Sequence, residues 1–193
     1  MTFNLIDTIP QFLFRDVYRF RSQIINGYFD YTLLKPMSPL FKSLFGGSDI
    51  LDFFTLILLI IVLVIIMQHI GSISLTGIIE YILLIINACC IALAFHIFVL
   101  SLGILTTEVD NAIMLYRDLT QMGRFPVDIY TQPLRGILTF AIPVGIMMTF
   151  PAKAVLGLLS FWLIFFAFLV GITLLYVSYI LWKYSLHFYT SAS

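Results

Sequence analysis

The chain of 193 residues is poor in charge: only 10% of its residues are Asp, Glu, Lys or Arg, whereas 61% are hydrophobic. Soluble domains carry about 25% charged and about 45–50% apolar residues. A water-soluble fold of this size could not hide so much apolar surface. Ten acidic residues balance ten basic ones, so no net positive field attracts nucleic acid. The composition excludes a soluble globular protein and predicts an integral membrane protein.

The sequence also lacks the usual signs of catalysis and of cofactor binding. Its two cysteines, Cys89 and Cys90, are adjacent within an apolar run, which predicts neither a disulfide framework nor a metal site. The motifs G-x-x-x-x-G-K-[ST], H-E-x-x-H and G-x-S-x-G are missing. We therefore expect no catalytic residue, no bound metal and no cofactor in this chain. The first fourteen residues contain no basic residue, so they do not resemble a cleavable signal and are interpreted as mature chain or as the cut end of a longer one.

Three apolar stretches are long enough to cross a membrane: residues 50–70, 78–104 and 158–182. A helix over 50–70 would be about 31 Å long, which matches the hydrocarbon core of a bilayer. His96, in the second stretch, is either a proton relay or a histidine that only hydrogen-bonds between helices, and we favour the second role. The sequence therefore predicts an all-α, polytopic membrane helix bundle that forms a single domain over residues 1–193.

Residues 107–124 carry a polar stripe at helical spacing, opposite an apolar face that includes Val109, Ile113 and Tyr116. The stripe consists of Thr107, Asp110, Asn111, Arg117, Asp118, Gln121 and Arg124. Such a helix could lie in the membrane interface. It could equally be a fourth span whose stripe faces the bundle interior or a water-filled path. The pattern alone does not decide between the two.

Residues 125–157 contain four prolines, Pro126, Pro133, Pro143 and Pro151. The apolar pieces 134–142 and 144–150 are each too short to cross a bilayer. Pro143 removes a backbone donor between them, which breaks the helix there. We therefore predict a re-entrant hairpin over 134–157 on the external side, covered by protein where it enters the membrane.

Residues 1–49 contain five of the ten basic residues, which assigns this region to the cytoplasmic side of the plasma membrane. An amphipathic helix is expected over 11–25 because apolar residues recur there at helical spacing. Pro36 blocks helix continuation. Ser38 and Pro39 are typical of a helix start, so a short helix is expected over 39–45.

Three segments carry recognisable motifs. Residues 26–42 read N-G-Y-F-D-Y-T-L-L-K-P-M-S-P-L-F-K, residues 123–130 read G-R-F-P-V-D-I-Y, and residues 134–157 read L-R-G-I-L-T-F-A-I-P-V-G-I-M-M-T-F-P-A-K-A-V-L-G. They resemble, in the same order, the patterns G-x-[LF]-D-x-x-L-L-[KR]-P-[LM]-[NS]-P-L, G-R-[YF]-P-[LV]-D-I-[YF] and L-R-x-[IL]-L-T-[FY]-x-[IL]-P-[LV] of type-two ABC exporter permeases. The resemblance covers essentially the whole chain.

This resemblance implies the transmembrane subunit of an ATP-driven exporter. A separate ABC ATP-binding subunit would hold ATP and Mg²⁺, and a second permease subunit would complete a homo- or heterodimer in the lipid bilayer. The substrate, expected to be hydrophobic or amphipathic, would move outward. The segment that couples to the ATPase would contain Gly27, Asp30, Leu34, Lys35 and Pro36. The translocation path or dimer interface is assigned to Asp110, Asn111, Arg117, Asp118 and Gln121. The external hairpin motif is assigned to Gly123, Arg124, Pro126, Asp128, Arg135 and Pro143.

The sequence departs from the family pattern at its start. Family members usually have two spans before the coupling segment, so we expect the first span and most of the second to be missing here. Two alternatives to an exporter subunit stay open at this point: a truncated membrane scaffold that binds a partner without transporting, and a small channel lined by the 107–124 stripe.

Overall fold

The computed structural model describes residues 1–71, 73–106 and 109–190, and within these ranges it contains helices and no strands. The predicted all-α membrane helix bundle is confirmed. Thr107 and Glu108, at the start of the predicted 107–124 helix, lie outside the described residues. The elements in chain order are α1 (Thr2–Leu13), η1 (Arg15–Arg19), α2 (Phe20–Ile25), α3 (Tyr28–Leu33), α4 (Pro39–Phe45), α5 (Ile50–His69), α6 (Leu75–Thr106), α7 (Val109–Gln121), η2 (Met122–Arg124), η3 (Val127–Ile129), α8 (Leu134–Gly136), η4 (Ile137–Ala141), η5 (Gly145–Thr149), α9 (Phe150–Val155) and α10 (Phe161–His187).

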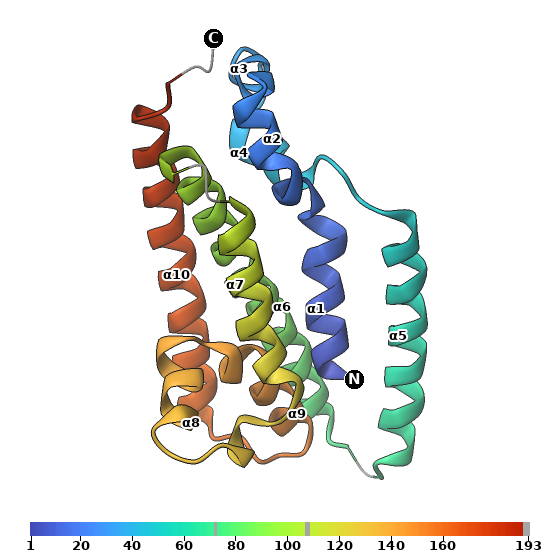
Figure 1. The fold of residues 1–193 in the computed structure, drawn as a ribbon. Coiled ribbons are helices and arrows are strands. Elements are labelled where there is room, and N and C mark those ends of the chain that lie inside the picture. The colour runs from blue at the N-terminus through green and yellow to red at the C-terminus, as the bar shows by residue number, and fades with distance from the viewer. Residues whose placement is uncertain (72, 107–108, 191–193) are drawn as a thin grey trace.

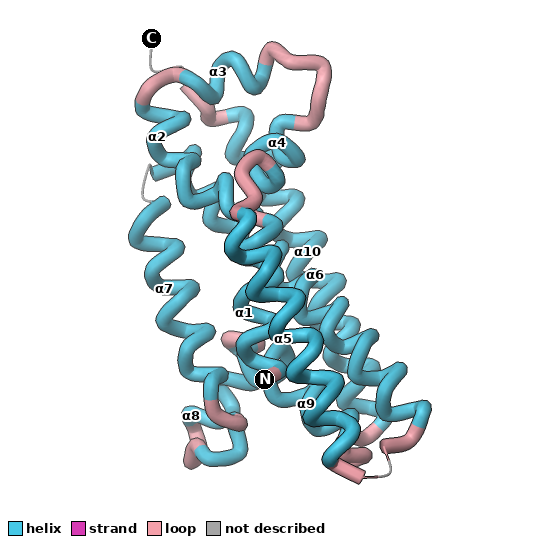
Figure 2. Tube along the Cα trace, turned by 90° about the vertical axis from the view of Figure 1, so that its right-hand side faces the viewer, coloured by secondary structure: helices cyan, strands magenta, loops and turns pink. Residues whose placement is uncertain are grey.

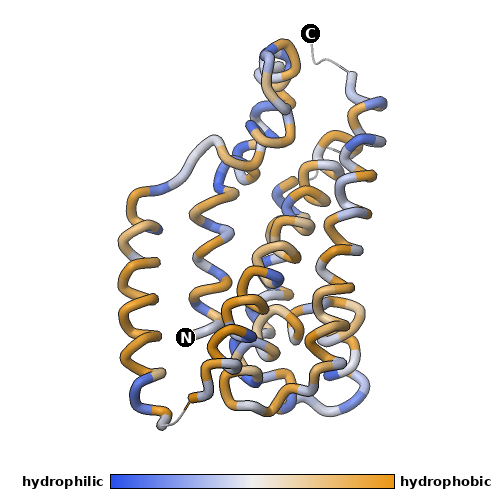
Figure 3. Tube along the Cα trace, turned by 180° about the vertical axis from the view of Figure 1, so that it is seen from behind, coloured by the Kyte–Doolittle hydropathy of each residue, from blue (hydrophilic) through white to orange (hydrophobic). Residues whose placement is uncertain are grey.

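Three long apolar helices, α5, α6 and α10, give the molecule its length (Figure 1). Each is long and apolar enough to cross a membrane, and the bent pair Leu134–Ala141 and Gly145–Val155 would add a fourth crossing only if it were one span. Figure 3 shows that hydrophobic residues fill most of the length of these helices. α6 is the central element, with α1, α7, α9 and α10 packed against it. α5 packs on α1 and has no buried residue of its own.

Helices α6 and α10 form the largest contact in the bundle, and small and polar residues bring their backbones close. Asn87 is buried on α6 and donates from Nδ2 to the carbonyl of Ala167 on α10, at 2.9 Å. Gly171 leaves the space that this amide occupies, since a Cβ there would lie 2.2 Å from Asn87 Oδ1. Interhelical hydrogen bonds and small residues are the usual means of helix association in lipid.

The prediction of a single helix over 11–25 is wrong. The chain forms α1 from Thr2 to Leu13, turns at Phe14 (φ −111°, ψ 27°), and continues as η1 and α2. The Phe14 ring packs 5.2 Å from the His96 ring and 5.4 Å from the Phe45 ring, and this packing holds the turn. The turn also changes which residues are covered, and Asp16 is buried.

Helix α1 lies in the same layer as the long helices. It packs against both α5 and α6, and Met1 and Thr2 line a cavity with Leu63, Met67 and Tyr81, far from α3 (Figure 1). Residues 1–49 therefore do not gather at one end of the bundle. α2, α3 and α4 do gather at one end, beyond the ends of α5 and α7 (Figure 2). The assignment of this region to the cytoplasmic side stays a prediction.

The two ends of the bundle have separate cores. We call the end with α2, α3 and α4 the coupling end, and the end with α8, η4, η5 and α9 the hairpin end. At the coupling end the core includes Phe20, Phe29, Leu100 and Trp182. At the hairpin end it includes Leu84, Met147, Phe150 and Ala167. Helices α6 and α10 contribute to both cores and connect the two ends.

Candidate functional site

The coupling segment, residues 26–42, is a rigid two-helix element at the coupling end. Gly27 has φ 70°, a conformation that glycine adopts without strain, and it reverses the chain between α2 and α3. Ser38 accepts a hydrogen bond from the Phe41 amide, at 3.4 Å, and Pro39 occupies the first turn of α4. The turn between α3 and α4 contains Lys35 and Pro36, both exposed.

Large apolar side chains of this segment point away from the rest of the chain. Leu34, at the end of α3, is 82% exposed and is the most exposed of the large hydrophobic residues. The others on α3, α4 and the turn between them are Tyr28, Tyr31, Leu33, Met37, Phe41 and Phe45. Several large apolar side chains exposed on one short element are typical of a site for another protein. We call these seven residues the exposed coupling surface.

Asp30 faces the other way, toward the bundle. Its Oδ1 accepts a hydrogen bond of 2.8 Å from the hydroxyl of Tyr189, just beyond the end of α10. Burial, together with the hydrogen bond to Asp30, raises the pKa of Tyr189 to about 12, so the hydroxyl stays protonated and can donate near neutral pH. Phe29, the neighbour of Asp30, is fully buried and packs edge-on against the Phe20, Trp182 and Tyr189 rings.

Helix α7 connects the coupling end to the hairpin end and packs along α6 (Figure 1). Its apolar face, with Val109 and Ile113, is buried against the bundle. On the opposite side, the stripe residues Asn111, Asp118 and Gln121 are exposed and do not face the interior of this chain. Asp110 and Arg117, by contrast, lie toward the N-terminal elements, and the use of the stripe stays a prediction.

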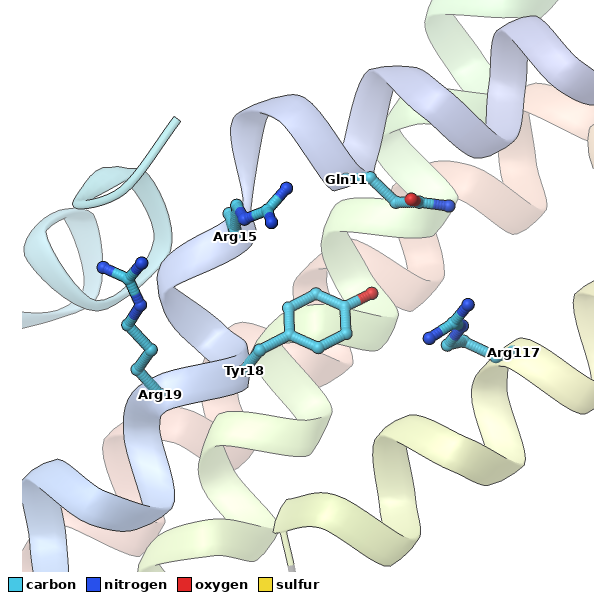
Figure 4. Close-up of a pocket in the computed structure, with 5 residues that line it drawn as sticks. All are labelled: Gln11, Arg15, Tyr18, Arg19 and Arg117. Atoms are coloured by element: carbon cyan, nitrogen blue, oxygen red, sulfur yellow. The ribbon is translucent and has the colours of Figure 1, made fainter. Parts of the chain in front are cut away.

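Arg117 and Asp110 are the stripe residues that the fold brings to other elements. Arg117 lines a cavity of about 330 Å³ with Gln11, Arg15, Tyr18 and Arg19. Figure 4 shows Tyr18 pointing toward Arg117, whereas Arg19 points away from it. Asp110 forms an ion pair of 2.7 Å with Arg21. Because both partners are about half exposed, this pair contributes little stability.

His96 fills the space between α6, α7 and the turn after α1. It is buried, and its Nδ1 lies 2.7 Å from the carbonyl of Ala92, one turn earlier on the same helix. The rings of Phe14, Tyr18 and Tyr116 surround it at centroid distances of 5.2, 6.5 and 5.1 Å. This hydrogen bond lies within α6, so the expectation that His96 hydrogen-bonds between helices is wrong, and the ring packs among these aromatic neighbours.

At the hairpin end, Asp128 is the centre of a small charge cluster. Its two carboxylate oxygens lie 2.5 Å from Arg135 and 2.6 Å from Lys153. The hydrogen bond from Lys153, reinforced by the positive charge of both partners, lowers the pKa of the Asp128 carboxyl. The three residues line a cavity of about 250 Å³. Arg124 and Pro126 are exposed, and Arg124 forms no ion pair within the described ranges.

The G-R-F-P-V-D-I-Y motif is packed onto the hairpin by its buried members. Gly123 fits beneath the hairpin, because a Cβ there would lie 2.6 Å from Val144 Cγ1 and 2.7 Å from Met148 Cγ. The Val127 amide donates to Thr149 Oγ1 at 3.2 Å, and the Tyr130 hydroxyl donates to the Met122 carbonyl at 2.9 Å. The motif therefore packs against the hairpin and is hydrogen-bonded to it.

The hairpin bends by 82° between Leu134–Ala141 and Gly145–Val155, at the position of Pro143. Asp128 precedes this segment and Lys153 lies near its end, yet the two side chains form an ion pair. Residues that touch in this way lie at the same end of the bundle. This is the arrangement that the predicted re-entrant hairpin requires, and whether the segment crosses the membrane stays a prediction.

Sequence reasoning missed three residues that the fold brings to these sites: Tyr189, Lys153 and Tyr18. Tyr189 lies outside the three motif segments. Lys153 lies in the third segment but beyond the positions that its pattern specifies, and Tyr18 lies in the predicted 11–25 helix. In the part of the chain that the structure describes, no group of three or more His, Cys, Asp or Glu side chains is placed to hold a metal ion.

The comparisons with known proteins agree with this picture. The model of a family described as ABC-2 family transporter protein matches residues 1–193. Searches of curated proteins and of solved structures gave no match.

Proposed function

Because the chain belongs to the ABC-2 family of transporter proteins, we propose that it is the membrane permease of an ATP-driven exporter and works with a separate ATP-binding subunit. The family supports a transmembrane permease of an ABC transporter, in keeping with the long apolar helices. The proposal adds the outward direction, the docking site for the ATPase, and a second permease subunit. It also places the chain in the plasma membrane, with the coupling end in the cytoplasm.

The exposed coupling surface is the observation that carries the proposal. It presents tyrosine, phenylalanine, leucine and methionine side chains on a rigid element at the end of the bundle. Aromatic residues and Met are enriched at the centres of protein interfaces. Lys35 and Lys42 lie beside it and add positive charge, as expected on the cytoplasmic side of a membrane. A partner that moves on binding ATP would push on this element.

The exposed part of the polar stripe of α7 supports a second permease subunit. Asp118 and Gln121 are exposed in a helix that runs beside the apolar α6. Charged groups in contact with lipid are costly, about 2.5–3.5 kcal/mol at the bilayer centre on insertion scales. A second subunit packed across this stripe, with a water-filled path between the two, would remove that cost. The substrate would then move along the stripe toward the hairpin end.

The proposal is tested by photo-crosslinking in native membranes. A photoreactive residue replaces Leu34 in one variant and Leu75, which is 74% exposed at the opposite end, in the matched control. We expect position 34, and not position 75, to crosslink a protein that contains a G-x-x-x-x-G-K-[ST] motif, identified by mass spectrometry. If position 34 captures no such protein, or if both positions capture it equally, the chain is better described as a scaffold.

A further inference from the structure

We infer that Tyr189 is a positioning residue that fastens the coupling segment to α10, so that the two move as one body when the coupling segment is displaced. This inference rests on the proposed function for its consequence in transport, but the contact itself belongs to this chain alone. Tyr189 lies outside all three sequence motifs. The argument starts from the hydrogen bond between its hydroxyl and Asp30 Oδ1, at 2.8 Å.

The hydrogen bond joins α3 to the segment after α10, between two residues that are 159 positions apart. Asp30 lies in the middle of α3, directly after the buried Phe29. Tyr189 follows the C-terminal end of α10, where the chain leaves the bundle. A hydrogen bond to a carboxylate contributes more than one between neutral groups, so this bond helps to hold the short helix α3 against the end of α10.

Aromatic rings pack around this hydrogen bond and also join α3 to the end of α10. The Phe29 ring lies 5.1 Å from the Tyr189 ring and 6.3 Å from Trp182, both edge-on. Trp182 is itself buried and also faces Phe20 at 6.3 Å. Edge-to-face pairs of this kind contribute beyond the area that they bury. A displacement of α3 would therefore have to carry the end of α10 along or break all of these contacts.

The opposite end of α10 is tied to the hairpin, which makes α10 a mechanical link between the two ends. α10 is a single unbroken helix from Phe161 to His187. Near its start, Phe166 packs against Phe140 of the hairpin, with ring centroids 5.6 Å apart, and Ala167 belongs to the core at the hairpin end. Motion that enters at Asp30 would thus reach the hairpin through one rigid element.

Two substitutions isolate the contact. Tyr189→Phe removes the hydroxyl and keeps the ring, and Asp30→Ala removes the acceptor. Tyr184→Phe is the matched control, because Tyr184 lies in the last turns of α10, close in sequence to Tyr189, and is 55% exposed. Hydrogen exchange is measured on the purified permease without any ATPase. Loss of a charge-assisted hydrogen bond should speed exchange of the amides in 28–34 by about tenfold or more. The effect should stay confined to this region and to residues 182–190, and the double variant should exchange no faster than either single one.

The link to transport is read separately, in the complex with the ATP-binding subunit. A cysteine replaces the exposed Ile129 at the hairpin end, in a Cys89→Ser, Cys90→Ser background. ATP should change its labelling rate in the wild type and in Tyr184→Phe, and not in Tyr189→Phe, while hydrolysis continues. Three results would overturn the inference: wild-type hydrogen exchange in Tyr189→Phe, additive effects in the double variant, or an ATP-dependent labelling change in Tyr189→Phe that equals that of the wild type. If no ATP-binding subunit binds even the wild-type chain, the proposed function fails and the exchange result still decides whether the contact exists.

Discussion

At the scale of single residues, the two aspartates of the motifs each pair with a side chain from another part of the chain. Asp30 and Asp128 each turn toward another element of the chain, whereas Asp118 is exposed on α7. The motifs pointed to Asp30 and Asp128, because an acidic residue at a fixed place in an otherwise apolar chain is noticeable. The partners Tyr189 and Lys153 could not be found in the same way, because only the tertiary fold brings them near.

Replacing Asp128 should lower the stability of the fold, because Asp128 forms the ion pairs at the hairpin end. Asp128→Asn leaves Arg135 and Lys153 close together without the negative charge between them. The three side chains are partly exposed, so we expect a loss of about 1 kcal/mol or less, a fall in Tm of roughly 2–4 °C. Thermal unfolding in detergent measures this, with Asp118→Asn as the matched control that should leave the Tm unchanged.

The effect of Asp128 should also depend on pH in one direction. Its pKa in the folded chain is lower than the ordinary value of 3.8. The charged carboxylate therefore stabilises the fold above about pH 4, and this contribution is lost as the pH falls through the lower folded pKa. The difference in Tm between wild type and Asp128→Asn should be full at pH 7 and shrink below pH 4. A difference that grew on acidification would contradict the assignment.

At the scale of elements, the length of apolar stretches and the residues typical of helix starts predicted helices correctly. The turn at Phe14 near the N-terminus could not be predicted from the sequence. The short helix expected over 39–45 is α4, Pro39–Phe45, because Ser38 and Pro39 fix its start locally. α1, by contrast, contains Pro10 and Asp7, which argue against a helix in isolation. It forms because α5 and α6 cover it, and its end at Phe14 depends on His96 and Phe45. Such tertiary causes are not visible in local periodicity.

The contact between α6 and α10 should not tolerate a side chain at Gly171. In Gly171→Ala the new Cβ would collide with Asn87, whose amide is buried and bonded to Ala167. Overpacking of this kind costs typically about 1–3 kcal/mol. Thermal unfolding of the purified chain should show the loss, whereas Thr173→Ala, an exposed position on the same helix, should behave like wild type. A stable Gly171→Ala protein would mean that the two helices are less closely packed.

The hairpin arrangement predicts a definite labelling pattern. Single cysteines replace Ile129, Leu156 and Tyr184, all exposed, in a background without Cys89 and Cys90. An impermeant thiol reagent on intact cells should label positions 129 and 156 and spare position 184. Labelling at 129 and 184 without 156 would show that the segment between Leu134 and Val155 crosses the membrane.

At the scale of the whole molecule, the bundle has two ends with different features, and long helices run between them. The coupling end presents an apolar surface on a fixed element, and the hairpin end closes the bundle with a bent segment. Helices α6 and α10 join the two. Sequence motifs could indicate both ends, because they carry glycines, prolines and charges at fixed spacing. They could not indicate that α7 leaves part of its polar stripe exposed, since that depends on which face packs on α6.

The exposed part of this stripe predicts a contact between two permease subunits. A cysteine at position 118 should be joined to a second permease chain by a short bifunctional crosslinker in membranes. A cysteine at Ile172, which is 67% exposed on α10, is the control and should face lipid. Crosslinking at 172 in preference to 118 would place the subunit contact on α10 and leave the stripe of α7 without this role.

The central claim is that the exposed coupling surface is where an ATP-binding subunit engages this permease. The most direct measurement is the affinity of the purified ATP-binding subunit for the permease in lipid vesicles, for wild type, Leu34→Asp and the control Leu75→Asp. A buried apolar anchor replaced by a charge should weaken binding by about 2 kcal/mol or more, roughly 30-fold. We predict this loss for Leu34→Asp alone. Wild-type affinity in Leu34→Asp, or an equal loss in Leu75→Asp, would contradict the account.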